Sequence, residues 1–125
     1  MPTCNITTEG DLLIITVTGK LTAEDVISVI NEYYPNGIVQ DVIWNLTDGS
    51  MSLISKQGFQ NIASAALTSL KGGARQGGKT VYVGLADVEY GLLRMYSAIA
   101  EMAGIPIEYR VFRTLEEARN WLGNV

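Results

Sequence analysis

The sequence predicts one α/β domain that spans residues 1–125 and contains a mostly parallel five-stranded sheet. Short segments rich in β-branched residues alternate with longer segments of helical periodicity, in the order ββαβαβαβα. Hydrophobic residues make up 47% of the chain and charged residues 18%, which is enough apolar material for one core. A chain of 125 residues fits a single domain.

The expected strands are short and are bounded by turn residues. They cover residues 4–9, 11–18, 41–46, 79–85 and 107–112. Glu9, Gly10 and Asp11 form a tight turn, so the first two strands are expected to pair as an antiparallel hairpin. The third strand is mostly apolar, including Ile43 and Trp44, which is typical of a strand buried on both faces of a parallel sheet.

The expected helices carry their own start and stop signals. They cover residues 23–34, 53–70, 90–103 and 115–122. Thr22 and Thr114 are good N-cap residues, and acidic side chains follow each of them in the first turn, where the helix dipole favours them. Glu117 lies three residues after Thr114, which is the spacing of a capping box. Residues 35–37, Pro-Asn-Gly, are expected to stop the first helix.

The composition disfavours several classes of function. The net charge of −4 repels phosphate backbones, so nucleic-acid binding is not expected. The longest apolar runs are only a few residues long, so no segment is expected to span a bilayer. Residues 1–9 lack the features of a signal peptide, and Cys4 is the only cysteine. We therefore expect no internal disulfide and a cytoplasmic location.

Residues 73–80 match the letters of a phosphate-binding P-loop. A P-loop follows a strand and opens a helix, because the helix N-terminus holds the phosphates. Here the order is reversed, since a helix precedes the segment and Lys79 begins a strand. We therefore expect a helix-to-strand connection and no nucleotide site.

Catalytic and metal-binding groups are sparse. The chain has no histidine, so a Ser-His or Cys-His pair cannot form. One cysteine cannot make a zinc site, and Cys4 on an edge strand is expected to be a buried apolar residue. Asp48 and Asp87 follow separate strands, where solvated loop acids are expected in preference to a magnesium site. We predict no catalytic residue, no metal and no cofactor, so the domain acts by binding.

Functional loops of a parallel sheet usually lie outside the carboxyl ends of its strands. Three loops qualify in this chain, at residues 19–22, 47–52 and 86–90. The second loop carries Asp48, Ser50 and Ser52. Ser52 is placed to cap the helix that follows, and a phosphate on a serine there would also be held by the helix N-terminus. Both interpretations stay open.

Segment 90–103 is apolar on more sides than a core helix needs. A sufficient core stripe consists of Leu92, Tyr96, Ile99, Ala100 and Ala103. The apolar residues outside this stripe are Leu93, Met95, Ala98 and Met102. They are expected to face a ligand cavity, a partner subunit, a membrane or a neighbouring element that covers the helix. Arg94 is the only charge between Tyr90 and Glu101, and it either holds an anionic ligand group or pairs with Asp87 or Glu89.

Several segments occur in a characteristic order. They are Gly19-Lys20-Leu21-Thr22, the strand at 41–46 before a serine-containing loop, Tyr-Gly-Leu-Leu-Arg-Met-Tyr at 90–96, Val-Phe-Arg-Thr-Leu-Glu-Glu-Ala at 111–118, and Trp121-Leu122. Over nearly the whole chain this pattern resembles the SpoIIAA-like group of the STAS class, which includes bacterial anti-sigma-factor antagonists and regulatory domains of sulfate transporters. The resemblance implies a singly wound sheet with helices mainly on one face.

The same resemblance implies a non-catalytic regulatory module that docks a protein partner, such as an anti-sigma factor or kinase. Phosphoregulated antagonists carry the modified serine in an Asp-Ser-Ser-Gly motif. Here Asp48 matches, Gly49 replaces the first serine, and Ser50 and Ser52 are the nearest phosphoacceptor candidates.

An alternative function is suggested by the lipid-carrying CRAL-TRIO domains, which share the fold. In this alternative the protein is a carrier or sensor of a small amphiphile or lipid, bound in a cleft beside helix 90–103. The candidate residues for a ligand or an interface are Asp87, Tyr90, Leu93, Arg94 and Met102. A homodimer and peripheral membrane association are further expectations from this apolar helix.

Overall fold

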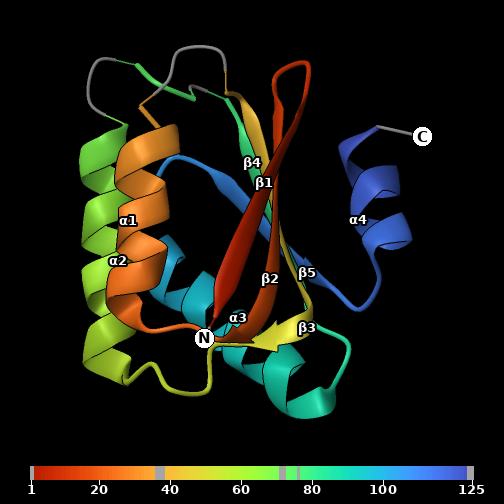
Figure 1. Cartoon of the computed structure of the whole chain (residues 1–125). Coiled ribbons are helices and arrows are strands. Elements are labelled where there is room, and N and C mark those ends of the chain that lie inside the picture. The colour runs from red at the N-terminus through yellow and green to blue at the C-terminus, as the bar shows by residue number, and fades with distance from the viewer. Residues whose placement is uncertain (1, 36–38, 71–72, 76, 124–125) are drawn as a thin grey trace.

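The structure is a computed structural model that describes residues 2–35, 39–70, 73–75 and 77–123. Its strands are β1 (Thr3–Glu9), β2 (Leu12–Lys20), β3 (Asp41–Ser50), β4 (Lys79–Val83) and β5 (Glu108–Phe112). Its helices are α1 (Ala23–Tyr33), α2 (Lys56–Ser69), α3 (Asp87–Met102) and α4 (Leu115–Leu122). The predicted element order is confirmed (Figure 1).

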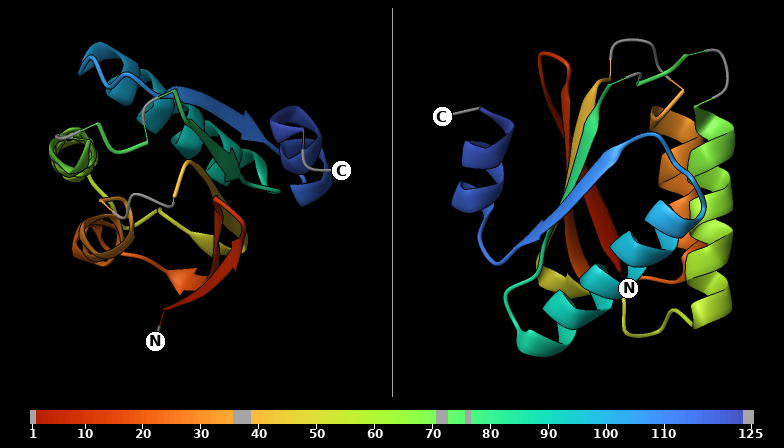
Figure 2. Two further views of the ribbon diagram at one scale, coloured as in Figure 1. Left: turned by 90° about the horizontal axis from the view of Figure 1, so that it is seen from above. Right: turned by 180° about the vertical axis from the view of Figure 1, so that it is seen from behind.

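The five strands form one sheet in the order β1-β2-β3-β4-β5. β1 runs antiparallel to β2, with Ile6 opposite Ile15, which confirms the predicted hairpin. The other neighbouring pairs, β2 with β3, β3 with β4 and β4 with β5, are parallel. Each crossover helix returns the chain to the next position in the sheet. β1 and β5 are therefore the two edge strands (Figure 2).

The helices divide unequally between the two faces of the sheet. α1, α2 and α3 cover one face and α4 covers the other, which confirms that the helices lie mainly on one face (Figure 1). Val42 and Trp44 of β3 belong to the core under the three helices, whereas Ile43 belongs to the core under α4. Successive side chains of a strand point to opposite faces, so β3 is buried on both sides, as predicted.

Both predicted helix caps are present. The Thr22 hydroxyl accepts the Asp25 N–H at 3.2 Å, and the Asp25 carboxylate accepts the Thr22 N–H at 2.9 Å, so α1 begins with a full capping box. The Thr114 hydroxyl accepts the Glu117 N–H at 3.2 Å at the start of α4. These local signals set where the two helices begin.

β3 is longer than predicted, because it ends at Ser50 and not at Leu46. β2 continues to pair with it, with Thr18 opposite Asp48, after an irregularity in the register. The strands approach so closely at Gly49 that a β-carbon there would lie 2.6 Å from a side-chain atom of β2. Pairing with β2 therefore extends β3 into a polar segment that has no strand pattern of its own.

Two helix starts also differ from the prediction. α2 begins at Lys56, and its N-cap is Ser55, whose hydroxyl accepts the Gly58 N–H at 3.0 Å. The expectation that Ser52 caps this helix is wrong, because the chain makes a further turn before the helix begins. α3 begins at Asp87, three residues earlier than predicted.

The glycine-rich connection before β4 carries a buried charge at Arg75, which is 2% exposed. Its guanidinium donates to the carbonyl oxygen of Gln40 at 3.0 Å, to the carbonyl oxygen of Lys79 at 2.9 Å and to the hydroxyl of Thr80 at 2.7 Å. It also lies 4.7 Å from the centre of the Tyr34 ring. The connection is thus fastened to the sheet by a cation.

Lys79 begins β4, as predicted, so the residues with P-loop spelling lead into a strand. Residues 71, 72 and 76 of this connection lie outside the described residues, and so do residues 36–38, of which 36 and 37 belong to the predicted stop of the first helix. Across the described segments, no helix is long and apolar enough to cross a membrane.

Candidate functional site

The three predicted functional loops follow β2, β3 and β4 at the end of the sheet drawn at the bottom of Figure 1. The Leu21 N–H donates to the Ser50 carbonyl oxygen at 2.9 Å, which joins the first loop to the end of β3. The Met51 N–H donates to a carboxylate oxygen of Glu89 at 2.8 Å, which joins the second loop to α3. The three loops therefore form one continuous surface.

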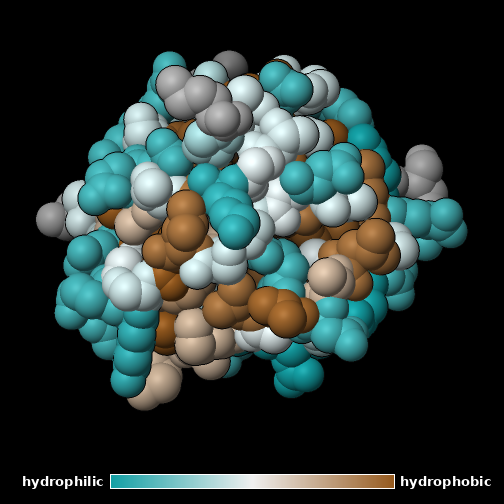
Figure 3. All heavy atoms as spheres, turned by 60° about the horizontal axis from the view of Figure 1, so that its bottom comes forward, coloured by the Kyte–Doolittle hydropathy of each residue, from teal (hydrophilic) through white to brown (hydrophobic). Residues whose placement is uncertain are grey.

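Large apolar side chains are exposed on this surface. Leu53 of the β3–α2 loop is 60% exposed, Leu85 of the β4–α3 loop is 55% exposed, and Val88 in the first turn of α3 is 73% exposed. Figure 3 brings this end of the molecule forward and shows hydrophobic groups among hydrophilic ones. We define the strand-end face as Asp48, Ser50, Ser52, Leu53, Leu85 and Val88.

The predicted loop residues come together on the strand-end face. Asp48 and Ser50 belong to the last part of β3, and Ser52 follows in the loop. Ser50 is half-buried and its hydroxyl accepts the Ser52 N–H at 3.0 Å, whereas the Ser52 side chain is exposed. Both serines stay candidates for phosphorylation, and Ser52 is the more accessible one.

Asp87 forms an ion pair that the sequence did not indicate. Its carboxylate accepts a hydrogen bond from Arg113 at 2.6 Å, and Arg113 also donates to the Leu85 carbonyl oxygen at 3.2 Å. The Arg113 guanidinium lies 4.4 Å from the centre of the Tyr90 ring. Asp87 pairs with Arg113 and Glu89 binds the loop after β3, and neither forms an ion pair with Arg94 among the described residues. Of the two alternatives for Arg94, the anionic ligand group stays open.

No group of three or more histidine, cysteine, aspartate or glutamate residues within the described segments could hold a metal ion. Cys4 lies on the edge strand β1 and is half-buried. Burial raises the pKa of its thiol, and the nearby Asp25 carboxylate raises it further. A raised pKa lowers the fraction of reactive thiolate, which fits a packing role for this side chain.

The buried stripe of α3 differs from the predicted one. Leu93 is completely buried and its side chain packs so closely on Gly84 that a β-carbon there would lie 2.8 Å from it. The buried residues of α3 are Glu89, Leu93, Tyr96, Ser97 and Ala100. The expectation that Leu93 faces a ligand cleft or a subunit is therefore wrong, because the helix is rotated toward β4 and β5 along this stripe.

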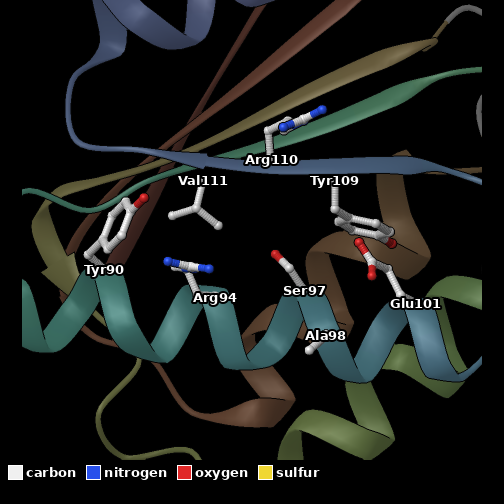
Figure 4. A pocket seen from close by; sticks show the side chains of 8 residues that line it. All are labelled: Tyr90, Arg94, Ser97, Ala98, Glu101, Tyr109, Arg110 and Val111. Atoms are coloured by element: carbon white, nitrogen blue, oxygen red, sulfur yellow. The ribbon is translucent and has the colours of Figure 1, made fainter.

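A groove of about 420 Å³ runs between α3 and the edge strand β5. Figure 4 shows four α3 side chains, Tyr90, Arg94, Ser97 and Glu101, pointing toward β5, and two β5 side chains, Tyr109 and Val111, pointing toward α3. Arg110 points to the other face of the sheet, where its guanidinium lies 5.6 Å from the centre of the Trp121 ring (Figure 4). We call this space the α3–β5 groove.

A separate hollow of about 370 Å³ lies between α2 and α3. Its lining residues are Lys56, Gln60, Ala63, Ser64, Ile99, Met102 and Ala103. Met102 is 88% exposed and Lys56 supplies a cation. The single cleft expected beside this helix is thus divided, since Arg94 lies in the α3–β5 groove and Met102 in the α2–α3 hollow.

Comparison with known proteins identifies the fold. No protein-family model matches the chain, and no curated protein matches it. The solved structure of the anti-sigma factor antagonist SpoIIAA in its unphosphorylated form is 15% identical with a TM-score of 0.58, over 98% of this chain and 100% of that one. An anti-sigma factor antagonist from Mycobacterium paratuberculosis is 15% identical with a TM-score of 0.60, over 98% of this chain and 95% of that one.

A third solved structure points to the same fold. An uncharacterised protein from Shewanella loihica with a SpoIIAA-like fold is 22% identical with a TM-score of 0.52, over 97% of this chain and 93% of that one. All three similarities extend over nearly the full length of both chains, and they agree with the observed sheet order and helix placement. The chain therefore has the SpoIIAA-like STAS fold.

Proposed function

We propose that this domain is a non-catalytic regulatory module that docks a protein partner through the strand-end face. The observation that carries the proposal is the group of three exposed apolar side chains, Leu53, Leu85 and Val88, on loops joined by the Met51–Glu89 hydrogen bond. Apolar groups surrounded by polar ones are typical of the core and rim of a protein interface. A loop held by a buried carboxylate also loses little conformational entropy on binding.

The solved structures with this fold suggest the class of partner. Two of them are anti-sigma factor antagonists. We propose that the partner is an anti-sigma factor of the same organism, and that Asp48 and the two loop serines lie at the rim of the contact.

The docking proposal is tested with matched leucine variants. Leu53→Asp places a charge on the strand-end face, whereas Leu67→Asp makes the same change on α2, where Leu67 is 41% exposed near the opposite end of the molecule. Purified anti-sigma factors are titrated with both variants by isothermal titration calorimetry. We expect Leu53→Asp to weaken binding at least about tenfold and Leu67→Asp to leave it unchanged. Equal effects, or no binding by the wild type, would refute the proposal.

Phosphorylation of the same loop is tested in the same system. Phosphate on an exposed serine adds charge to the strand-end face and changes what can dock there. The domain is incubated with ATP and a cognate anti-sigma kinase, and the modified peptide is mapped by mass spectrometry. Phosphate on Ser50 or Ser52 would support a switch, and its absence from both would leave docking without that switch.

A second candidate function is binding of a small anionic amphiphile in the α2–α3 hollow. The observation that favours it is the exposed Met102 beside the cation of Lys56. A fatty acid such as laurate would raise the melting temperature by binding the folded state. Met102→Asp should abolish that rise, whereas Met95→Asp, a matched change on the same helix outside the hollow, should not. If laurate does not change the melting temperature of the wild type and light scattering shows a dimer, this helix face would instead be a self-association surface.

A further inference from the structure

We propose that the α3–β5 groove binds an extended peptide segment of a partner protein, which adds to β5 as a sixth strand and places a carboxylate on Arg94. This site lies beside the edge of the sheet and uses none of the residues of the strand-end face. The inference therefore stands independently of the docking proposal. Three features of this region support the proposal: the open edge of β5, the wall that α3 forms beside it, and two charges in that wall.

The outer edge of β5 has backbone groups without a strand partner. Glu108 donates its N–H to Gly78 of the chain segment leading into β4, and Phe112 accepts at its carbonyl oxygen from Gly84 after β4. Backbone groups of alternate residues in a strand point to opposite sides. Tyr109 and Val111 therefore direct their N–H and C=O groups to the outer edge, where the described residues place no further strand.

α3 packs on β5 and forms one wall of the groove beside this edge. Tyr90, Arg94, Ser97 and Glu101 lie on one face of the helix and point toward the strand (Figure 4). A strand edge facing a helix can hold an extended peptide, because the edge supplies main-chain hydrogen bonds and the helix contacts alternate side chains. The two sides of this groove match those two requirements.

The charges in the wall favour a particular peptide. The ion pairs of the described residues are Arg110–Glu108, Arg113–Asp87 and Arg119–Glu9. Arg94 and Glu101 take part in none of them, and the Arg94 guanidinium lies 6.0 Å from the centre of the Tyr90 ring. An exposed guanidinium with free donors binds a carboxylate well. Arg94 therefore selects an acidic side chain or a carboxyl terminus.

The distance between the two charges sets the length of the recognised segment. Arg94 and Glu101 are seven residues apart, which is about 10.5 Å along a helix. An extended strand rises about 3.3 Å per residue, so about three residues of peptide span the two charges. The preferred segment thus carries an acidic group at one end and a basic group about three residues away.

The edge is also protected against unspecific pairing. β5 has only five residues, and its side chains Glu108 and Arg110 are charged. Short edges with charged side chains resist pairing with arbitrary strands. A peptide that binds here must therefore gain additional contacts from α3, which makes the wall residue Arg94 the determinant of specificity.

The experiment selects peptides from a randomised eight-residue library displayed on phage. Selection on the wild-type protein follows depletion on Arg94→Glu, so that the enriched peptides depend on Arg94. We expect peptides with an acidic residue, and an affinity that Arg94→Glu weakens at least about tenfold by fluorescence anisotropy. Exchanging the acidic residue of the peptide for lysine should restore binding to Arg94→Glu.

Two controls separate strand addition from general attraction of charge. Lys56→Glu changes a charge at the separate α2–α3 hollow, and Leu53→Asp disrupts the strand-end face, so both should leave peptide affinity within about twofold. Bound peptide should slow hydrogen exchange of the Tyr109 and Val111 amides. A library that yields no Arg94-dependent peptide, or peptides that bind without protecting these two amides, would overturn the proposal.

Discussion

The sharpest stability prediction concerns Arg75, the cation that fastens the glycine-rich connection to the sheet. Its guanidinium donates to two carbonyl oxygens and to the hydroxyl of Thr80, at 2.7 to 3.0 Å, and lies over Tyr34. None of the ion pairs of the described residues includes Arg75. Neutral backbone and hydroxyl acceptors therefore hold a buried charge in place.

The substitution Arg75→Met keeps a long side chain and removes these donors. One buried acceptor and two part-buried acceptors lose this partner, and an acceptor costs up to about 1–3 kcal/mol when it is left unsatisfied. Partial entry of water and better packing of methionine offset some of this loss, so we expect a net destabilisation of about 3–5 kcal/mol. For a domain of this size that lowers the melting temperature by about 10–20 °C.

Urea unfolding monitored by tryptophan fluorescence measures this loss directly, because Trp44 donates its indole N–H to the Tyr34 hydroxyl at 2.8 Å beneath the cation. Arg75 has a φ of 55°, so methionine and lysine both keep the same backbone constraint. Arg75→Lys should lose about half as much stability as Arg75→Met, because one ammonium group cannot reach acceptors on several sides. Arg94→Met at an exposed position is the control and should change stability by less than about 0.5 kcal/mol.

A loss under about 1 kcal/mol for Arg75→Met would refute this reasoning. Replacing buried ionic groups by apolar ones is neutral or stabilising in some proteins. Such a result would show that the connection packs well without its cation, and that the hydrogen bonds of Arg75 do not stabilise the fold.

Three further predictions test other contacts. Leu93→Asp should unfold the domain, as seen by circular dichroism, because Leu93 is completely buried and a charge there has no partner. Gly78→Ala should lower the free energy of unfolding, measured by urea denaturation, by more than about 2 kcal/mol, because the added β-carbon would lie 2.2 Å from the Gln40 carbonyl oxygen. A smaller loss would show that the loop moves freely. Hydrogen bonds from Arg119 lower the pKa of Glu9, so this pair stabilises the folded state above the usual carboxyl pKa and stops doing so as pH falls through the lowered value. Glu9→Gln should therefore be less stable than wild type near neutral pH, and this difference should vanish in acid; a difference that persists there would contradict the assignment.

Local sequence signals predicted most of the fold. Thr22 and Thr114 cap their helices because a threonine hydroxyl satisfies free N–H groups next to it in the chain, which needs no distant partner. The hairpin of β1 and β2 follows from a tight turn between alternating segments in the same way. The order of elements also showed that residues 73–80 are not a P-loop, because a strand and not a helix follows them.

The candidate site was predicted in part. The three loops at 19–22, 47–52 and 86–90 lie at the same end of the sheet, because parallel strands end on the same side. The role of Ser52 as a cap was wrong, because a competing cap, Ser55, is three residues closer to the packed part of α2. Leu53 fell at the start of the expected helix 53–70, whereas the structure places it in the loop before α2 with an exposed side chain.

The sequence by itself determined the elements, their order and the caps that begin α1 and α4, because these depend on neighbours within a few residues. Only the tertiary structure decided the rotation of α3 that buries Leu93, the pairing that extends β3 to Ser50, and the positions of Glu89 and Arg75. The hydrogen bond of Glu89 joins residues that are 38 positions apart in the chain, and the hydrogen bond from Arg75 to Gln40 joins residues 35 positions apart. A contact across such a distance depends on how whole elements pack, and no periodicity within one segment encodes it.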